Sequence, residues 1–186
     1  RARELVAQIL SFSRTFKAER ESVKVGLIIQ EALKLLRVTI PTSIEIRQNI
    51  EDETGTVFAD PTEIHQIVMN LCTNAYQAME KRGGLLSVSL ESVELVEEDS
   101  TLNLAQGPYL KLLVCDTGSG MSAETTRNIF DPFFTTKERG KGTGLGLATV
   151  HNIVTELKGS ISVESVEGKG TTFCIYLPMI DGKIKT

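Results

Sequence analysis

The sequence lacks the features that would place it in several large classes of protein. Its 186 residues carry a net charge of -4, so no excess of positive charge draws it to nucleic acid or to an anionic membrane. The three cysteines lie far apart in apolar contexts, which argues against a disulfide framework and against zinc ligation. No apolar run approaches membrane-spanning length, and no signal peptide opens the chain. We therefore expect a cytoplasmic globular protein with reduced thiols and no nucleic-acid partner; membrane anchoring of a longer parent protein stays open.

A carboxylate followed by alternating glycines stands at the centre of the chain. The apolar run at 110–115 is typical of a buried strand, and Asp116 follows it directly, before Gly118 and Gly120. The glycines let a flat ligand approach the main chain closely, and an ionised carboxylate only accepts hydrogen bonds. The pattern therefore fits an exocyclic amino group, such as that of adenine. On its own, such a stretch is more often an ordinary turn.

A helix is predicted from Asp60 to about Lys81. Asp60 is a good N-cap, Pro61 suits the first helical position, and Glu63 completes a capping box. At about 100° per residue, an apolar face lies beside a polar stripe made of Glu63, Gln66, Asn70, Asn74 and Gln77. Asparagine is a poor residue for a helix interior, so the two asparagines one turn apart need an explanation. Either they are hydrogen-bonded or solvated amides, or they form a Mg²⁺ and phosphate site, since amide oxygens are hard ligands.

A glycine-rich segment at 140–147 opens a further helix, which is expected to reach about Lys158. Free N–H groups and the helix dipole at such a start favour anions. The segment is not a Walker A loop, because the Gly-Lys-Ser/Thr ending is missing, and its glycine spacing differs from the dinucleotide fingerprint. The stretch before it, from Asp131 to Gly140, is predicted to be a mobile loop with Phe133 and Phe134 as apolar anchors. The alternative is that the glycine-rich segment is merely flexible.

The remaining segments predict a mixture of helices and strands. Apolar spacing predicts a helix over 25–38, ended by Pro41, and Ser122 caps a short helix reaching about Phe130. Alternating residues predict strands near 44–48, 56–59, 85–96, 160–165 and 171–177. The strand at 85–96 is expected to pair antiparallel with that at 110–115, and the last two strands with each other. The polar stretch 20–24 is predicted to be a linker, and residues 181–186 a frayed tail.

The first 19 residues are predicted to be helical, because they contain neither Gly nor Pro. Leu5, Ile9, Phe12 and Phe16 alternate at spacings of four and three, the seam of a coiled coil or bundle helix. This helix either packs on its own domain or is the end of a dimerisation helix. We favour the dimerisation helix, because no capping residue precedes the seam and the seam is too short to stand alone.

Five motifs along the chain form an ordered set. They are Asn70-Leu-Cys-Thr-Asn74, Asp116-Thr-Gly-Ser-Gly120, Phe130-Asp-Pro-Phe-Phe134, Gly142-Thr-Gly-Leu-Gly146 and Gly168-Lys-Gly-Thr171. These resemble, in order, the N box, first glycine box, F box, second glycine box and closing Gly-x-Gly-Thr of sensor histidine kinases. The resemblance covers roughly residues 23–178, which is the catalytic, ATP-binding domain. That domain belongs to a superfamily with gyrase, a heat-shock chaperone and the MutL mismatch-repair ATPase.

The resemblance implies an α/β fold of the Bergerat type, a two-layer α+β sandwich in which helices cover one face of a mixed, largely antiparallel sheet. It implies a catalytic domain over 25–180, with residues 1–19 as the truncated end of the dimerisation and phosphotransfer helix. By position, Asp116 would accept from the adenine amino group, Asn70 and Asn74 would serve Mg²⁺ and the phosphates, and Lys137 would reach the γ-phosphate. The other nucleotide-contacting residues implied are Gln77, Gly118, Gly120, Met121, Lys141, Gly142, Thr143, Gly144, Leu145, Gly146 and Thr171.

Two departures from the family's pattern matter. The family often has a basic residue three positions after the second Asn, where this chain has Gln77. That puts one phosphate contact in doubt and more weight on Lys137 and Lys141. The phosphoacceptor box is also absent, since neither His65 nor His151 lies in a dimerisation hairpin with an acidic neighbour. We interpret both histidines as structural.

We interpret the chain as the ATP-binding part of a histidine protein kinase of two-component signalling. It would transfer the γ-phosphoryl group of ATP to a histidine on the missing dimerisation helix. The expected partners are ATP, Mg²⁺, the dimerisation domain of a homodimeric parent protein and a response-regulator receiver domain. The rivals are an ATPase or conformational clamp of the same superfamily and a nucleotide-sensing module. Asn70 favours the kinase, because the superfamily's ATPases carry a Glu there as the base that activates water.

Overall fold

The computed structural model describes residues 19–136 and 142–181. The predicted dimerisation helix before residue 19, Lys137 and Lys141 lie outside the described residues, as do positions 182–186 of the predicted tail. The elements in chain order are β1 (Glu21–Val23), α2 (Val25–Thr39), β2 (Ile44–Ile50), β3 (Thr56–Ala59), α3 (Pro61–Met79), β4 (Gly84–Leu95), β5 (Gly107–Asp116), α4 (Ala123–Asn128), α5 (Gly146–Glu156), β6 (Ser160–Val166) and β7 (Gly170–Asp181).

The described strands form one mixed sheet. Its order is β1-β3-β7-β5-β4-β2, and β6 also pairs with β7. Among these strands β2 and β4 pair in parallel, whereas the other pairs are antiparallel. β7 is the strand that joins the parts, because residues 170–178 pair with β5 or β6 and Met179 and Asp181 pair with β3. Both predicted hairpins, β4 with β5 and β6 with β7, are therefore confirmed.

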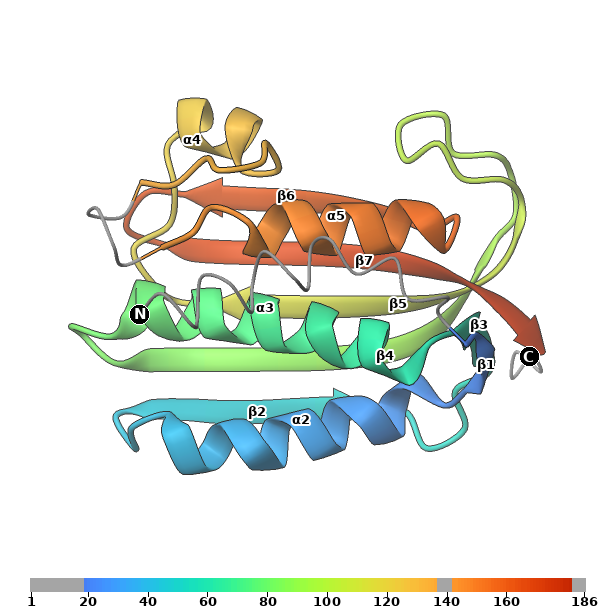
Figure 1. The fold of residues 1–186 in the computed structure, drawn as a ribbon, viewed down its shortest axis with the longest axis horizontal. Helices are drawn as coiled ribbons and strands as arrows, with labels where there is room; N and C mark the ends of the chain where they lie inside the picture. The colour runs from blue at the N-terminus through green and yellow to red at the C-terminus, as the bar shows by residue number, and fades with distance from the viewer. Residues whose placement is uncertain (1–18, 137–141, 182–186) are drawn as a thin grey trace.

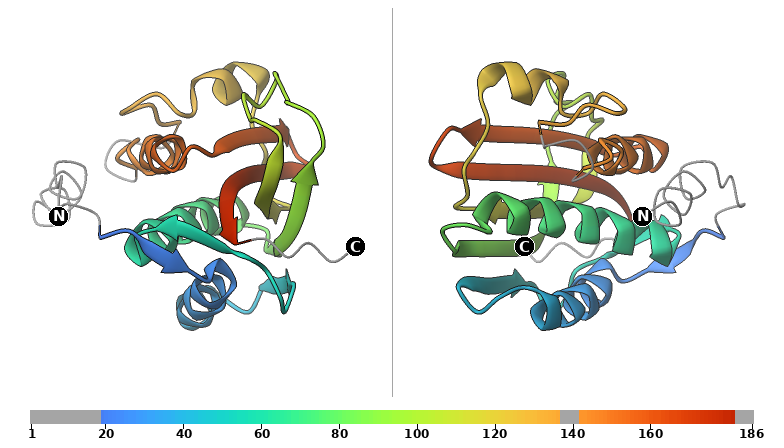
Figure 2. Two further views of the ribbon diagram at one scale, coloured as in Figure 1. Left: turned by 90° about the vertical axis from the view of Figure 1, so that its right-hand side faces the viewer. Right: turned by 60° about the vertical axis from the view of Figure 1, so that its left-hand side comes forward.

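Three helices form a layer on one face of this sheet (Figures 1 and 2). α3 lies in the middle of the layer and contacts α2 and α5 as well as β4, β5 and β7. The largest side chains buried between the layers are Ile29, Ile44, Ile64, Ile67, Leu71, Met79, Leu86, Leu90, Leu110, Leu112, Ile175 and Leu177. The short α4 lies apart from this layer and contacts β6. The predicted fold class, a two-layer sandwich with helices on one face of a mixed sheet, is confirmed.

α3 begins where the capping residues predict. The Asp60 carboxylate accepts from the Thr62 backbone N–H at 2.7 Å, and the Glu63 carboxylate accepts from the Asp60 N–H at 3.5 Å. Pro61 occupies the first helical position. The apolar positions of the predicted face, such as Ile64 and Val68, are buried. This local start fixes the register of the helix and so decides which of its residues face the sheet.

Two predictions at the margins of the domain are wrong. The stretch predicted to be a linker contains β1, whose three residues pair with β3. A strand of three residues shows too little alternation to be detected in sequence. The predicted tail is wrong at Asp181, because β7 continues past Leu177 to this residue and pairs there with Thr56. The helices and strands predicted at 25–38, 44–48 and 56–59 are confirmed.

Candidate nucleotide-binding site

The predicted motifs meet at one end of the sandwich. β5 and β6 end there, β7 begins there, and the C-terminal end of α3 and the N-terminal end of α5 lie there as well (Figure 1, left). The register places Asp116, the last residue of β5, opposite Thr171 on β7 and opposite Leu86 on β4. Residues that are far apart in sequence are therefore brought together by the ends of adjacent strands.

Asp116 is a half-buried carboxylate. Its Oδ1 accepts a hydrogen bond from the backbone N–H of Gly118 at 2.8 Å. Burial raises the pKa of the Asp116 carboxyl above its ordinary value, and the backbone N–H groups of Gly118 and Thr171 offset part of that rise. A carboxylate that has lost part of its hydration and only accepts hydrogen bonds suits a ligand that brings a donor, such as an amino group.

The loop after Asp116 is held from two sides. The Ser119 N–H donates to the carbonyl of Ala78 on α3 at 3.1 Å, and the Gly168 N–H donates to the Ser119 carbonyl at 2.7 Å. Gly120 has a φ of 62°, and a Cβ at this position would overlap the Val166 carbonyl. A residue with a side chain is therefore excluded here both by conformation and by space. The loop is fixed between α3 and the turn that joins β6 to β7.

The polar stripe of α3 lies next to the start of α5. Asn70 and Asn74 are one turn apart and half-buried, and Gln77 is exposed. A Cβ at Gly146, the first residue of α5, would lie 3.1 Å from Asn70 Oδ1. The N box and the second glycine box are thus in contact, as the family resemblance requires. The N-cap of α5, Leu145, makes no side-chain capping bond, and its own N–H donates to Thr143 Oγ1 at 3.4 Å.

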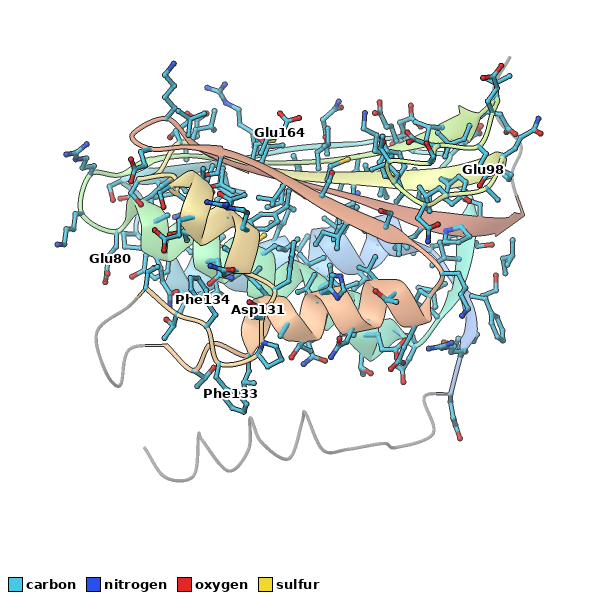
Figure 3. All side chains as sticks on the ribbon, turned by 90° about the horizontal axis from the view of Figure 1, so that it is seen from above. Glu80, Glu98, Asp131, Phe133, Phe134 and Glu164 are labelled. Carbon is cyan, nitrogen blue, oxygen red and sulfur yellow. The ribbon has the colours of Figure 1, made fainter. Side chains whose placement is uncertain are left out.

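The F box contacts the second glycine box through the backbone. The Phe133 N–H donates to the Gly144 carbonyl at 2.9 Å, and both residues have a φ of 67°. This is an uncommon conformation for a bulky residue, and such conformations concentrate at functional sites. The Phe133 side chain is 70% exposed and projects away from the sandwich, on the helix side of the sheet (Figure 3). Its neighbour Phe134 is half-buried and packs against the core.

The predicted site residues that the structure describes lie in two groups, which we name after the predicted roles. The adenine set consists of residues around the end of β5: Asp116, Gly118, Gly120, Met121 and Thr171. The phosphate set consists of residues on α3 and at the start of α5: Asn70, Asn74, Gln77, Gly142, Thr143, Gly144, Leu145 and Gly146. Lys137 and Lys141 lie outside the described residues. The predicted roles of the individual residues remain predictions.

Ser165 on β6 also lies at this end of the sheet, and it was not predicted as a site residue. Its hydroxyl accepts from the Met121 N–H at 2.8 Å and lies 2.9 Å from the Thr171 hydroxyl, so it belongs to the adenine set. No motif contains it. Its signal in the sequence is only that it lies on the inward face of a strand, at a position where alternation predicts an apolar residue.

The histidines and cysteines do not belong to these sets. His65 is half-buried on α3, and His151 is exposed on α5 with its ring 5.3 Å from that of Phe130. Cys72, Cys115 and Cys174 are unpaired, as predicted, and burial raises the pKa of the Cys72 thiol to about 12. In the part of the chain that the structure describes, no group of three or more His, Cys, Asp and Glu side chains could hold a metal ion.

A cavity of about 280 Å³ lies on the face of the sheet opposite the helices, and it contains none of the predicted site residues. Its lining consists of Leu102 and of residues on the strands: Lys111, Leu113, Ser162, Glu164, Thr172, Cys174 and Tyr176. Glu164 projects from this face, away from the helix layer (Figure 3). The chemistry of the motifs, rather than the size of this cavity, locates the candidate site on the helix side.

The fold and the site together define a nucleotide-binding domain with an α/β sandwich. Residues 59–181 match the family described as histidine kinase-, DNA gyrase B- and HSP90-like ATPase. The chain therefore belongs to this family. It corresponds in sequence and fold to the ATP-binding catalytic domain of sensor histidine kinases, as the motifs predicted.

Curated relatives and solved structures agree with this assignment. Sensor kinase CckA of Brucella abortus is 36% identical over 182 residues, which are 97% of this chain and 19% of the relative. Sensor histidine kinase ZraS of Escherichia coli K12 is 34% identical over 180 residues, 96% of this chain and 35% of the relative. The chain thus spans about a fifth to a third of the length of these proteins.

Among solved structures, the nucleotide-free catalytic domain of histidine kinase ThkA has a TM-score of 0.68 and 29% identity, covering 87% of this chain and 96% of that domain. Full-length ShkA in complex with AMPPNP has a TM-score of 0.73 and 24% identity, and it covers 95% of this chain and 35% of ShkA. The second likeness concerns the fold alone. In the described ranges, 19–136 and 142–181, no helix has both the length and the apolar character needed to cross a membrane.

Proposed function

We propose that this chain binds Mg-ATP between the end of β5 and the start of α5 and transfers the γ-phosphoryl group to a histidine of a dimerisation helix. One observation carries the proposal: a half-buried carboxylate lies at one end of the site, and an asparagine contacts the glycine-rich start of α5 at the other. The first suits a base with an amino group, and the second suits phosphates. Transfer by such a site depends mainly on positioning and charge neutralisation.

The base would lie against Asp116. The carboxylate would accept from the amino group, while Gly118 and Gly120 shape the loop beside it. Thr171, opposite Asp116 on β7, is only 7% exposed and would contribute its hydroxyl oxygen at this end of the site. The raised pKa of Asp116 supports this role, because the desolvated carboxylate regains a hydrogen-bond donor when the base binds.

The phosphates would lie over α3 and the start of α5. Asn70 and Asn74 offer amide oxygens, which fit Mg²⁺ because this ion is usually held by few protein oxygens together with phosphates and water. Mg²⁺, when bound, would supply charge neutralisation at the phosphates. The backbone N–H groups from Gly142 to Gly146 and the start of α5 would hold the phosphate oxygens. Lys137 and Lys141 would add positive charge, and Gln77 leaves one basic contact of the family unmatched.

An ATPase or conformational clamp of the same family is the second candidate. The residue that separates the two is Asn70, which lies where the ATPases carry a Glu as general base. An amide cannot take a proton from water, and general-base help is typically worth about 10²–10⁴ in rate. Asn70 therefore favours phosphoryl transfer to a histidine over hydrolysis.

The names of the relatives, which are sensor kinases, support the partners that we propose. They would be the dimerisation and phosphoacceptor domain of the same, homodimeric parent protein and the receiver domain of a response regulator. The ATP-binding domain would work in the cytoplasm, whether or not the parent protein is anchored in a membrane. No role in binding nucleic acid is proposed.

Binding and hydrolysis of ATP test this proposal together. Titration of the purified chain with a fluorescent ATP analogue should show saturable binding that Mg²⁺ strengthens, and release of phosphate from ATP should stay near the buffer rate. Saturable binding with robust hydrolysis would favour the ATPase. Absence of binding with or without Mg²⁺ would reject the assignment of the site.

A further inference from the structure

Ser165 on β6 contacts three groups of the adenine set. Its Oγ accepts a hydrogen bond from the Met121 N–H at 2.8 Å, donates to the Gly170 carbonyl at 3.1 Å and lies 2.9 Å from Thr171 Oγ1. One hydroxyl thereby ties the loop after Asp116 to the first residues of β7. The motifs that define the site leave Ser165 without a role.

A single arrangement of hydroxyl protons satisfies all three contacts. A serine hydroxyl has one proton and two lone pairs. The Gly170 carbonyl can only accept, so the Ser165 proton points to it. The Met121 N–H occupies one lone pair of Ser165 Oγ. The Thr171 hydroxyl must therefore donate its proton to the other lone pair.

This arrangement leaves Thr171 Oγ1 without a proton for a ligand. Ser165 is paired with Thr171 across β6 and β7, and Thr171 with Asp116 across β7 and β5. Directly paired residues project from the same face, so the three side chains form a row across three strands. The ionised Asp116 also only accepts hydrogen bonds. A base that lies against this row would therefore meet hydrogen-bond acceptors and no hydrogen-bond donors.

Adenine and guanine differ at the atom that such a row would contact. Adenine carries an amino group there, which donates, whereas guanine carries a carbonyl oxygen, which cannot. A carbonyl placed against Thr171 and Asp116 would leave acceptors facing one another with no proton between them. Unmatched polar groups in a partly desolvated site are a strong source of discrimination.

We infer that Ser165 is a positioning residue for base specificity, because it consumes the hydroxyl proton of Thr171 and so keeps this end of the site free of donors. The inference rests on the proposed function, since it places the base of the nucleotide against Asp116. Ser165 acts through Thr171 and Met121 and need not touch the nucleotide itself.

The affinity ratio for ATP over GTP, measured by calorimetry on the purified chain, tests this inference. Wild type should prefer ATP. In Ser165→Ala the Thr171 hydroxyl is free to turn and donate to guanine, so the ratio should fall about tenfold, the size of effect expected from one hydrogen bond. Ser165→Thr keeps a hydroxyl and should keep the ratio. Ser162→Ala is the matched control, because Ser162 lies on the same strand but lines the cavity on the opposite face, and it should leave the ratio unchanged.

A second variant separates this role from general stabilisation. Thr171→Val removes the hydroxyl through which Ser165 acts, so adding Ser165→Ala in that background should not change the ratio further. The ratio compares two ligands on one protein, so a smaller folded fraction does not alter it.

An unchanged ratio in Ser165→Ala, or an equal fall in the Thr171→Val background, would overturn the inference while leaving the proposed function intact if wild type binds ATP. Failure of wild type to bind either nucleotide would overturn both.

Discussion

Asp116 is unfavourable for folding and favourable for binding. Its pKa is raised by burial, which means that the folded protein holds the charged carboxylate less well than water does. The backbone N–H groups of Gly118 and Thr171 recover only part of this loss. A residue whose position lowers the stability of the fold is expected to have a role in binding a ligand. Replacement of Asp116 should therefore have opposite effects on stability and on ATP affinity.

The first prediction is that Asp116→Asn weakens ATP binding about ten- to hundredfold. One hydrogen bond to a charged group contributes roughly 1.5–3 kcal/mol, and an amide can present its N–H₂ to the amino group of the base. Titration with a fluorescent ATP analogue measures the affinity. Asp52→Asn, in an exposed turn, is the control and should bind as wild type. An unchanged affinity in Asp116→Asn would remove Asp116 from the site.

The second prediction concerns the stability of the nucleotide-free protein against pH. The folded pKa of Asp116 lies above its unfolded value, so its contribution to stability is present below the unfolded pKa and is lost as pH rises through the folded pKa. Asp116→Asn carries no charge, so at pH 7 it should unfold at a higher temperature than wild type. This gain should vanish at pH values below about 4, where the wild-type carboxyl is protonated in both states. A lower unfolding temperature than wild type at pH 7 would contradict the assigned cost of burial.

At the scale of residues, the sequence predicted which residues could contact the nucleotide but not which residues hold them in place. Asp116, Asn70 and the glycines could be predicted, because each belongs to a local pattern with a chemical reason. Ser165 could not be, because its role depends on pairing with Thr171 across the sheet. The left-handed conformation of Phe133 could not be predicted from the sequence either, because it depends on contact with Gly144. Contacts between residues distant in the sequence determine both.

At the scale of elements, α3 carries the predicted metal site. Its capping box fixes the start of the helix and therefore the direction in which the polar stripe points. The third prediction is that Asn74→Ala abolishes the strengthening of ATP binding by Mg²⁺, while stability without nucleotide stays within about 1 kcal/mol of wild type. Calorimetric titrations with Mg²⁺ and with EDTA measure this. Gln66→Ala, two turns nearer the start of the same stripe, is the control and should keep the Mg²⁺ effect. If Asn74→Ala kept it as well, the metal assignment would be wrong.

The contact between the F box and the second glycine box depends on Gly144. Gly144 and Gly168 both have positive φ, but a Cβ at Gly144 would overlap the Phe133 backbone, whereas nothing lies within 4 Å of a Cβ at Gly168. The fourth prediction is that Gly168→Ala costs only the conformational strain, about 1–2 kcal/mol, and keeps ATP affinity. Gly144→Ala should lower ATP affinity at least tenfold relative to Gly168→Ala, because it breaks the hydrogen bond from Phe133 and displaces the start of α5. Equal affinities in the two variants would show that this contact does not shape the site.

Elements with strong local signals were predicted well, and those defined by pairing were not. Apolar periodicity, capping residues or turn residues indicate where some elements begin and end. These elements are α2, α3, β3 and the hairpin of β6 with β7. β1 has only three residues, and it is defined by its antiparallel pairing with β3. β7 extends to Asp181 because β3 pairs with its last residues. The parallel pairing of β2 with β4 likewise has no signature in a single sequence.

At the scale of the whole molecule, the chain before β1 is tied to the helix layer. The Arg20 guanidinium lies 3.8 Å from the Glu63 carboxylate on α3 and 3.4 Å from that of Glu156 on α5. Together with β1, this pair of contacts fixes where the chain enters the catalytic domain. The candidate nucleotide site lies at one end of the sandwich, and β1, where the chain enters the domain, lies at the other end (Figure 1).

The most direct test of the account is phosphoryl transfer from γ-labelled ATP. The two histidines of the chain, His65 and His151, lie on α3 and α5 rather than in a dimerisation hairpin, and Asn70 supplies no base for water. The 186-residue chain alone should therefore neither label itself nor release appreciable phosphate. Addition of a separate protein that carries the dimerisation hairpin of the parent kinase should give labelled hairpin, with the acid lability of phosphohistidine. Rapid hydrolysis by the chain alone, or label on His65 or His151, would contradict the account.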